Sequence, residues 1–410
     1  SSTSRGLGDV YKRQYMLRWG TKTNIFYLCA GHYTVDYYNN FLPVLLPFIM
    51  VKLDMSLTMC GILVMVLAFV ASSIQPFVGY ITDKHDSSPW LLAAIPLSGI
   101  AICLAGLAPN KATLFLLCII MGITVSFVHP VGSALLGKVG NVSNMGRVMS
   151  LYVVGGNFGA AVAPATVMFL LDRYGLDILP LVAIPAVVLG ILFYFSGLYK
   201  LPSANAKKVS SSESISIIKI FANPSVALLN IAMGLRCCTH VSVSTFLPML
   251  MLSHGASNVV SGSMLTVFLM GTAAGGLIGG ELGDKFGHKR LMVVSLALTA
   301  LPTVLFFLYP DAGFISSLLL FMGGFFVQAP QPSSIVWTGR LMPQYIGVAS
   351  GMMMGLCFGL GSIGAAVTAA LGDYIGLETA MFLSVVPVVI ATILVIFTPY
   401  TKGVVVPKRK

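Results

Sequence analysis

The chain has 410 residues, of which 57% are hydrophobic and only 9% are charged. A soluble domain cannot remove so much apolar surface from water, so this composition excludes a soluble globular protein and predicts a helical protein with many membrane spans. The formal net charge is +11, and in a membrane protein such an excess indicates basic cytoplasmic loops rather than a nucleic-acid partner. At about 20 residues per span, this length holds roughly twelve spans with short loops.

The N-terminal end differs from the rest of the chain. Residues 1–14, SSTSRGLGDVYKRQ, resemble a translated sequencing adapter, so we expect residues 1–15 to be a non-native extension and Met16 to be the native start. The first long apolar run continues into a predicted span, which argues against a cleavable signal peptide.

Apolar runs divide the remaining chain into two groups of six. They predict an N-terminal six-helix bundle over residues 16–199 and a C-terminal six-helix bundle over residues 222–400. The segment 200–221 between them is rich in Ser and Lys, as is typical of a solvated linker, and residues 401–410 form a basic tail. The predicted spans are 24–51, 58–82, 90–109, 112–137, 146–171, 178–199, 222–252, 260–283, 290–309, 313–339, 346–371 and 378–398.

The distribution of basic residues predicts the topology. If both termini are cytoplasmic, the outer loops contain Lys52, Lys111 and Arg173, and Arg236 lies within a span. The other 20 of the 24 Lys and Arg residues then lie on the cytoplasmic side. This asymmetry favours an even number of spans with both termini in the cytoplasm.

The two halves repeat the same sequence steps. Gly79 and Asp83 recur as Gly280 and Asp284, 201 residues later. Six spans followed by six spans with equivalent steps predict two parallel repeats related by an axis along the membrane normal, with a central site between them. Further repeated steps are Asp172–Gly175 with Asp373–Gly376, Asn157–Gly159 with Cys357–Gly359, and Phe41–Pro43 with Phe246–Pro248.

Two loop segments and five N-terminal segments resemble known transporters. GELGDKFGHKR is similar to the loop signature of the major facilitator superfamily, and GYITDKHD is a weaker copy of it. GHYTVDYYNNFLPVLLPFI, SLTMCGIL, SSIQPFVGYITDK, SFVHPVGSALLG and GGNFG resemble the fosmidomycin-resistance type of efflux protein. The resemblance implies an all-α membrane protein with twelve transmembrane helices in two six-helix repeats. It also implies proton-coupled export of small anionic or amphiphilic compounds, as in antibiotic resistance, across a bacterial cytoplasmic membrane.

An acidic residue and a histidine lie together in the first predicted span. An ionisable group at membrane depth is costly, so Asp36 is a candidate functional residue. His32 lies four residues earlier, on the same helix face. A carboxylate beside an imidazole is a plausible proton site, because each group can shift the ionisation of the other. The alternative is a fixed structural hydrogen bond between the two.

The seventh span repeats this arrangement with basic groups. Arg236 and His240 are also four residues apart, and an offset of 204 aligns them with His32 and Asp36. Spans 1 and 7 should therefore face each other across the cavity. Arg236 could bind an anionic substrate through bidentate hydrogen bonds, or it could neutralise Asp36.

Other polar residues within spans are candidates for substrate binding. His129 precedes Pro130, which loosens the helix near the imidazole. A lone histidine in a membrane can equally be a satisfied hydrogen-bonding group between helices. Span 10 offers neutral amides at the matching place in Gln328 and Gln331. The remaining candidates are Asn40, Tyr37, Asn157 and Gln75.

The repeated Gly–Asp step predicts a gate at the cytosolic ends of spans 2 and 8. A glycine one turn before the aspartate, at Gly79 or Gly280, would let a neighbouring helix approach closely. Asp83 and Asp284 oppose their own helix dipoles, so each needs a neighbouring helix N-terminus or an arginine. The alternative is a role in folding and topology only. The other predicted gating residues are Lys84, Lys285 and Arg290, with Arg147 and Arg340 as partners.

The sequence predicts a transporter rather than an enzyme. It has no Walker motif and no metal triad, and its seven cysteines fall in apolar runs, so we expect neither a metal nor a cofactor. We expect a monomer that exchanges protons for a small organic anion or drug by alternating access. The alternatives are proton-coupled uptake or facilitated diffusion of a metabolite, and a non-transporting receptor or scaffold.

Overall fold

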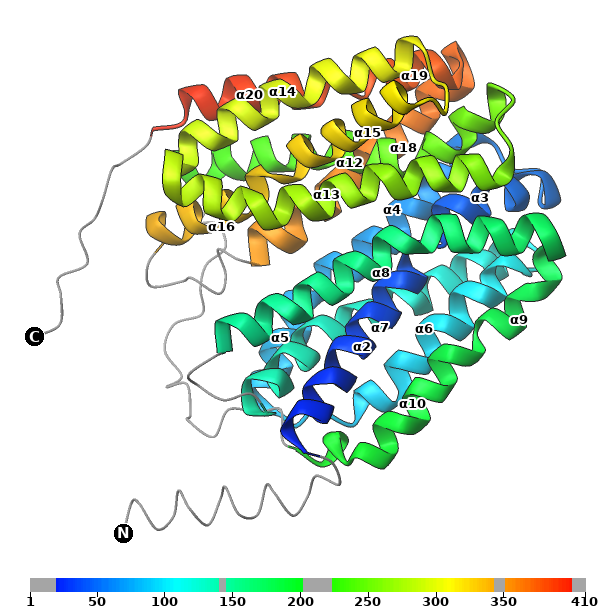
Figure 1. Cartoon of the computed structure of the whole chain (residues 1–410), viewed down its shortest axis with the longest axis vertical. Coiled ribbons are helices and arrows are strands. Elements are labelled where there is room, and N and C mark those ends of the chain that lie inside the picture. The colour runs from blue at the N-terminus through cyan, green and yellow to red at the C-terminus, as the bar shows by residue number, and fades with distance from the viewer. Residues whose placement is uncertain (1–19, 140–144, 202–222, 343–350, 400–410) are drawn as a thin grey trace, which may run out of the picture. The chain divides into compact units, whose positions relative to one another are not determined.

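The computed structural model describes residues 20–139, 145–201, 223–342 and 351–399, and all regular elements in these ranges are helical (Figure 1). The predicted extension 1–15, most of the linker 200–221 and the tail 401–410 lie outside them. Ten helical segments of the described residues are long and apolar enough to cross a membrane, and Trp90–Gly106 is a shorter apolar helix. Together with the broken segment Thr21–Lys52, they match the twelve predicted spans.

Proline breaks several predicted spans into pairs of helices. A proline at the first or second position begins the second helix of five spans, because its missing N–H group costs nothing there. These pairs are α2 (Thr21–Asn39) with α3 (Leu42–Lys52), α4 (Leu57–Ser73) with α5 (Gln75–Lys84), α9 (Leu179–Val182) with α10 (Ile184–Ser196), α15 (Phe314–Gln328) with α16 (Pro330–Leu341), and α19 (Leu377–Leu383) with α20 (Val386–Phe397).

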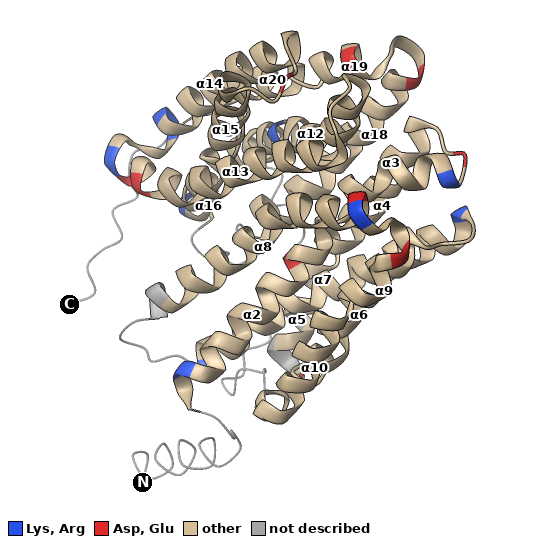
Figure 2. Cartoon of the chain, turned by 45° about the vertical axis from the view of Figure 1, so that its right-hand side comes forward, with Lys and Arg blue, Asp and Glu red and all other residues tan. Residues whose placement is uncertain are grey.

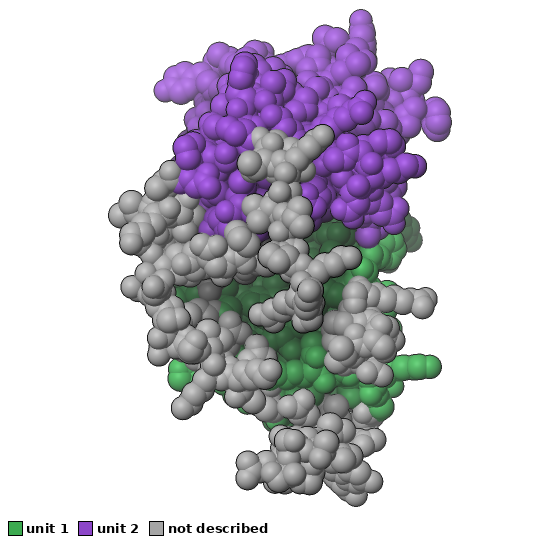
Figure 3. Space-filling model, turned by 90° about the vertical axis from the view of Figure 1, so that its left-hand side faces the viewer, with its two compact units in different colours: residues 1–53, 73–210 green, residues 54–72, 211–410 purple. Residues whose placement is uncertain are grey.

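The chain forms two compact units, each with its own helical core (Figure 3). The first unit covers residues 1–53 and 73–210, where α2 packs against α7 and α8. Its other elements are α3, α5, α6 (Trp90–Gly106), α7 (Lys111–Val139), α8 (Met145–Tyr174), α9, α10 and the short turns η2 (Leu176–Ile178) and η3 (Leu198–Lys200).

The second unit covers residues 54–72 and 211–410. It therefore includes α4, whereas the sequence predicted these residues in the N-terminal bundle 16–199. In this unit α12 packs against α18 and α13 packs against α15. Its elements are α4, α12 (Pro224–Ser253), α13 (Asn258–Phe286), α14 (His288–Leu308), α15, α16, the π-helix η4 (Met352–Leu356), α18 (Cys357–Ile375), α19 and α20.

The N-terminus of α4 is capped by a carboxylate from α18. Asp373 accepts hydrogen bonds from the backbone N–H of Leu57 at 3.0 Å and of Thr58 at 2.8 Å, and from the Thr58 hydroxyl at 2.5 Å. A helix begins with N–H groups that have no partner within the helix, and its dipole favours a negative charge there. Asp373 therefore fixes the start of α4.

Replacing this carboxylate should destabilise the second unit. We expect Asp373→Ala to lower the free energy of unfolding by about 0.5–1 kcal/mol, because a lost N-terminal cap costs this much at an exposed site. Asp373→Asn keeps one carbonyl oxygen and should lose less. Thermal unfolding of the purified variants measures the difference, and equal stability of wild type and Asp373→Ala would exclude a capping role.

Candidate functional site

Charged residues concentrate at the ends of the helices (Figure 2). Asp36 and Arg236 differ from this pattern. Asp36 lies in the last turn of α2 of the first unit, in the middle of the broken segment Thr21–Lys52, and Arg236 lies in the interior of α12 of the second unit. The Asp36 side chain is 16% exposed, and Arg236 is fully buried. Each of them is the centre of a polar cluster within its own unit.

In the first unit, Asp36 lies between two imidazoles. His32 Nε2 is 3.2 Å from one carboxylate oxygen, and His129 Nε2 of α7 is 3.4 Å from the other. The two imidazole rings meet edge to face, with their centroids 4.8 Å apart. The predicted pair of His32 and Asp36 is therefore present, and His129, which we expected at a substrate site, joins it.

The hydrogen bonds of His32 restrict where protons can lie. The Nδ1–H of His32 donates to the Tyr152 carbonyl oxygen at 2.8 Å, so Nε2 faces Asp36. If Asp36 is ionised, Nε2 must carry a second proton in order to donate to it. If Asp36 is protonated, its hydroxyl donates to a neutral Nε2. Either way, His32 and Asp36 hold one exchangeable proton between them.

The same three groups could in principle serve as metal ligands. Their ligand atoms lie within 4.8 Å of one another, and two imidazoles with one carboxylate are a common set for zinc. Both contacts to Asp36 are already at ion-pair distance. A proton shared with His32 satisfies the first and the Nε2–H of a neutral His129 satisfies the second, without a metal ion.

Helix α8 holds this cluster in place. The Tyr152 ring stacks on the His32 ring with a centroid distance of 4.1 Å and an interplanar angle of 21°. One turn later, Gly156 lies so close that a methyl group there would overlap Asp36 and His32. Gly156 is thus the residue that lets α8 approach the carboxylate.

A methyl group at this position should therefore disturb the cluster. We expect Gly156→Ala to lower the free energy of unfolding by about 1–3 kcal/mol, which is the usual cost of overpacking, and to reduce transport. Gly137→Ala in α7 is the control, because a methyl group there meets no atom within 4 Å and alanine favours a helix. Thermal unfolding and transport assays compare the two. Wild-type behaviour of Gly156→Ala would contradict the tight packing.

In the second unit, neutral acceptors surround Arg236. Its Nη1 donates to the Val327 carbonyl oxygen at 2.8 Å and to Gln328 Oε1 at 2.7 Å. Its Nη2 donates to Gln331 Oε1 at 2.8 Å and to Cys237 Sγ at 2.9 Å. These contacts connect α12 to the break between α15 and α16. Gln328 and Gln331 were both predicted site residues, and Arg236 brings them together.

This arginine has no carboxylate partner among the described residues of its own unit. Its Nε–H makes no hydrogen bond with the described chain, and the same is true of His240 Nδ1. The Phe358 ring lies 5.5 Å from the guanidinium carbon and 5.6 Å from the His240 ring. A buried cation without a counter-charge is costly, so this site is electrostatically suited to an anion.

The predicted bidentate edge of Arg236 is not free in this structure. Four of its five N–H groups already have acceptors. A bound oxyanion would have to displace at least one of them in order to gain two parallel hydrogen bonds.

The remaining predicted substrate-binding residues do not belong to either polar cluster. The Asn40 amide donates to the Asp36 backbone carbonyl at 2.9 Å. The Tyr37 hydroxyl bonds the Thr166 hydroxyl of α8 at 2.9 Å. Gln75, at the start of α5, and Asn157, in α8, are half-buried. Their substrate roles stay predictions.

The described residues show no close helix approach at either of the two predicted gating glycines. A methyl group on Gly79 would meet nothing within 4 Å, and one on Gly280 would make only an ordinary contact with Pro332. The close approach is at Gly279 and Gly275, which touch the backbone of α15 and Ala329. The packed face of α13 is therefore rotated by one residue from the face that carries Asp284.

The predicted charged gating residues whose side chains the structure describes are all exposed. Asp284 is 78% exposed, and its carboxylate lies 3.6 Å from His288 Nε2. Lys285, Arg290 and Arg340 are exposed. The side chains of Asp83, Lys84 and Arg147 lie outside the described part of the chain. A gating role for these residues stays a prediction.

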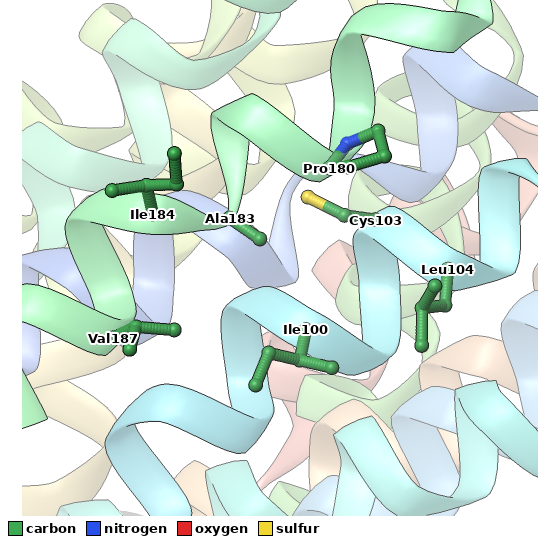
Figure 4. A pocket seen from close by; sticks show the side chains of 7 residues that line it. All are labelled: Ile100, Cys103, Leu104, Pro180, Ala183, Ile184 and Val187. Carbon is green, nitrogen blue, oxygen red and sulfur yellow. The ribbon is translucent and has the colours of Figure 1, made fainter.

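An apolar groove in the first unit shares no lining residue with the Asp36 cluster. It has a volume of about 270 Å³ and is bounded by α6 on one side and by α9 and α10 on the other (Figure 4). Its lining is apolar apart from the Cys103 thiol, so it offers no group for binding a charged substrate. The lining residues are Ile100, Cys103, Leu104, Pro180, Ala183, Ile184 and Val187.

Sequence reasoning missed several residues of these sites. Tyr152 acts through its backbone carbonyl, and any residue type supplies that group. Gly156 has no role in the sequence-based predictions, and Asp373 enters them only in a repeated sequence step. A signal for Gly156 was available, because it lies one turn from Tyr152 on α8, but the helix that it faces could not be known.

A helical membrane protein with a carboxylate–imidazole cluster in one unit and a buried arginine in the other has the features of a secondary transporter. The sequence profile of the Major Facilitator Superfamily matches residues 28–257 and 229–410, so the chain belongs to this superfamily. It is a multi-pass membrane protein of a family that transports small molecules and is not enzymatic.

Relatives and solved structures agree with this assignment. The chain is 28% identical over 347 residues to the MFS-type transporter YfnC of Bacillus subtilis, covering 83% of this chain and 84% of that protein. It is 26% identical over 362 residues to the fosmidomycin resistance protein of Escherichia coli, covering 86% of each. A variant of the nucleoside transporter NupG shares the fold, with a TM-score of 0.74 and 15% identity over 92% of this chain and all of that one. The bacterial relatives support a location in the bacterial inner membrane.

Proposed function

We propose that this chain is a proton-coupled antiporter that exports a small organic anion or drug by alternating access. The observation that carries the proposal is the position of Asp36 between His32 and His129. A carboxylate in the middle of a predicted membrane span is a costly feature, and a proton that can be gained and lost there gives it a use.

The proton cycle uses the hydrogen bonds of this cluster. In the loaded state, His32 and Asp36 share a proton. Loss of that proton leaves a neutral His32 whose Nε2 lone pair faces a carboxylate, an arrangement that repels. The Nε2–H of His129 can then donate to the other carboxylate oxygen and stabilise its charge. Gain and loss of this proton therefore change which imidazole forms the hydrogen bond to Asp36.

Arg236 supplies the substrate side of the proposal. Its charge has no carboxylate partner among the described residues of its unit, so an anionic group of a substrate would supply the missing charge. Names of relatives support the substrate class, since one is a fosmidomycin resistance protein and another is the multidrug resistance protein MdtG. Fosmidomycin, a phosphonate, is therefore the first probe to use.

Everted membrane vesicles test the coupling. Respiration acidifies their interior, and the dye acridine orange reports the pH gradient. In vesicles from a host without its own fosmidomycin exporter, we expect fosmidomycin to dissipate the gradient only when this chain is present. Fosmidomycin movement only down its own gradient, without proton movement, would favour facilitated diffusion, and proton movement in the same direction as fosmidomycin would favour coupled uptake. Binding without any flux would favour a receptor.

A further inference from the structure

Gln331 connects Arg236 to an irregular turn in the helix that contains Phe358. Its Oε1 accepts from Arg236 Nη2 at 2.8 Å, and its Nε2 donates to the Met353 backbone carbonyl at 2.7 Å. Gln331 is 7% exposed, and Arg236 and Met353 are fully buried. Both ends of one amide are therefore occupied, one by the cation and one by the backbone of another helix.

The carbonyl that Gln331 binds belongs to a π-helical turn. Residues 352–356 form the π-helix η4, and the N–H of Cys357 bonds to the Met352 carbonyl, five residues back. In an α-helix that N–H would bond to the Met353 carbonyl, four residues back. The extra residue thus deprives Met353 of its usual partner, and the Gln331 amide takes the place of that partner. Single π-helical turns of this kind are frequent at functional sites.

The free Nε–H of Arg236 shows where an oxyanion would bind. Nε–H and one N–H of Nη2 point in parallel from the same edge of the guanidinium, and such an edge binds carboxylates and phosphonates with two hydrogen bonds. Nε has no acceptor among the described residues, whereas Nη2 is held by Gln331 and Cys237. An anion on this edge neutralises Arg236, which weakens its charge-assisted bond to Gln331, and competes with the two acceptors of Nη2, Gln331 and Cys237.

We propose that Gln331 is the positioning residue that couples anion binding at Arg236 to the conformation of the π-helical turn at residues 352–356. This inference rests on the proposed function, because it takes Arg236 as the site of the anion. When the anion binds, Gln331 Oε1 no longer accepts from Arg236, and Gln331 Nε2 no longer donates to the Met353 carbonyl. The turn then rewinds, and the N–H of Cys357 bonds to Met353 as in an α-helix. The change shifts the register of α18 at its start.

Two other residues provide matched controls. Gln328 donates nothing to η4 in the described structure, but its Oε1 accepts from Arg236 as Gln331 does. Gln328→Leu therefore removes one acceptor from the arginine and leaves the connection to Met353 intact. Gln331→Leu removes both, and Gln331→Glu keeps an acceptor for Arg236 but cannot donate to Met353 while it is ionised.

Hydrogen–deuterium exchange of the full-length protein tests the proposal without any ligand. In Gln331→Leu and Gln331→Glu, the uncapped Met353 carbonyl should recover the N–H of Cys357, which leaves the Met352 carbonyl, so the pattern of amide exchange within residues 352–357 should differ from that of the wild type. In Gln328→Leu, exchange in this segment should equal that of the wild type. Equal exchange in all four proteins would overturn the proposal.

A second measurement adds fosmidomycin as the probe. In the wild type and in Gln328→Leu, the probe should change exchange within residues 352–357 in the same direction as Gln331→Leu does without the probe, and in Gln331→Leu it should bind and leave this segment unchanged. Wild-type protein that binds and transports fosmidomycin with no change in this segment would overturn this inference alone. Wild-type protein that does not bind the probe at all would overturn the substrate assignment at Arg236 together with the inference. The wild-type comparison remains valid even if a variant does not fold.

Discussion

Asp36→Asn is expected to abolish export driven by a pH gradient and to leave exchange of substrate for substrate intact. The reason is the geometry of the cluster, since an asparagine keeps a carbonyl oxygen near His32 and His129 but cannot ionise. The variant can then change between its inward-facing and outward-facing states only with substrate bound, so it exchanges substrate for substrate. Proteoliposomes with labelled fosmidomycin measure both modes, and gradient-driven export by the variant should fall to the rate of protein-free liposomes.

The matched control is Asp177→Asn. Asp177 is exposed and lies in the short turn after α8, so its loss should change neither mode. Gradient-driven export by Asp36→Asn at the wild-type rate would exclude Asp36 as the proton carrier. Loss of both modes in Asp36→Asn, with normal folding, would assign this residue to the substrate cycle instead.

Arg236→Ala should weaken fosmidomycin binding by about 10- to 100-fold, because charge-assisted hydrogen bonds contribute about 1.5–3 kcal/mol. Arg236→Lys keeps the positive charge but loses the planar pair of donors, so we expect an intermediate loss. Isothermal titration of the purified protein measures the dissociation constants. The buried cation has no carboxylate partner among the described residues of its unit, so its removal also relieves a desolvation cost, and we expect the variant to insert and fold.

Arg340→Ala serves as the control for the loss of a positive charge. Arg340 is exposed in the last turn of α16, and its replacement should leave fosmidomycin affinity unchanged. Wild-type affinity in Arg236→Ala would refute the role of this arginine in anion binding. An equal loss in both variants would indicate a general electrostatic effect rather than a site at Arg236.

The fold could be predicted because its signal is carried by long stretches of sequence. Apolar runs of span length specify helices in a membrane, since a backbone without internal hydrogen bonds is not stable there. The predicted major facilitator fold is confirmed by the family match and by the fold of solved transporters. The internal breaks were harder to place, because a proline such as Pro43 can either kink a helix or begin a new one.

The sites could be predicted only where their partners lie on one helix. His32 and Asp36 are one turn apart, so the sequence alone placed them together. The contact between His129 and Asp36, 93 residues away in the chain, depends on how α7 packs against α2. The same spacing at Arg236 and His240 suggested a second pair, but two basic groups do not bind each other, and Arg236 instead binds Gln328 and Gln331.

The packing glycines show a further limit of sequence reasoning. A repeated Gly–Asp step suggested that Gly280 is the contact face of its helix, whereas Gly279 touches the neighbouring backbone. In a run with glycine at both positions, the sequence does not indicate which face turns toward the neighbour. The π-helical turn at residues 352–356 was equally hidden, because Gln331, whose amide binds its Met353 carbonyl, belongs to another helix.

Proton release on substrate binding tests the central claim most directly. Purified wild-type protein in weakly buffered detergent solution is mixed with fosmidomycin while a pH-sensitive dye records free protons. If substrate and proton exclude each other, the wild type should release protons as it binds fosmidomycin, and Asp36→Asn should bind it without release. Binding by the wild type with no proton release at any pH between 5 and 8 would contradict antiport through Asp36.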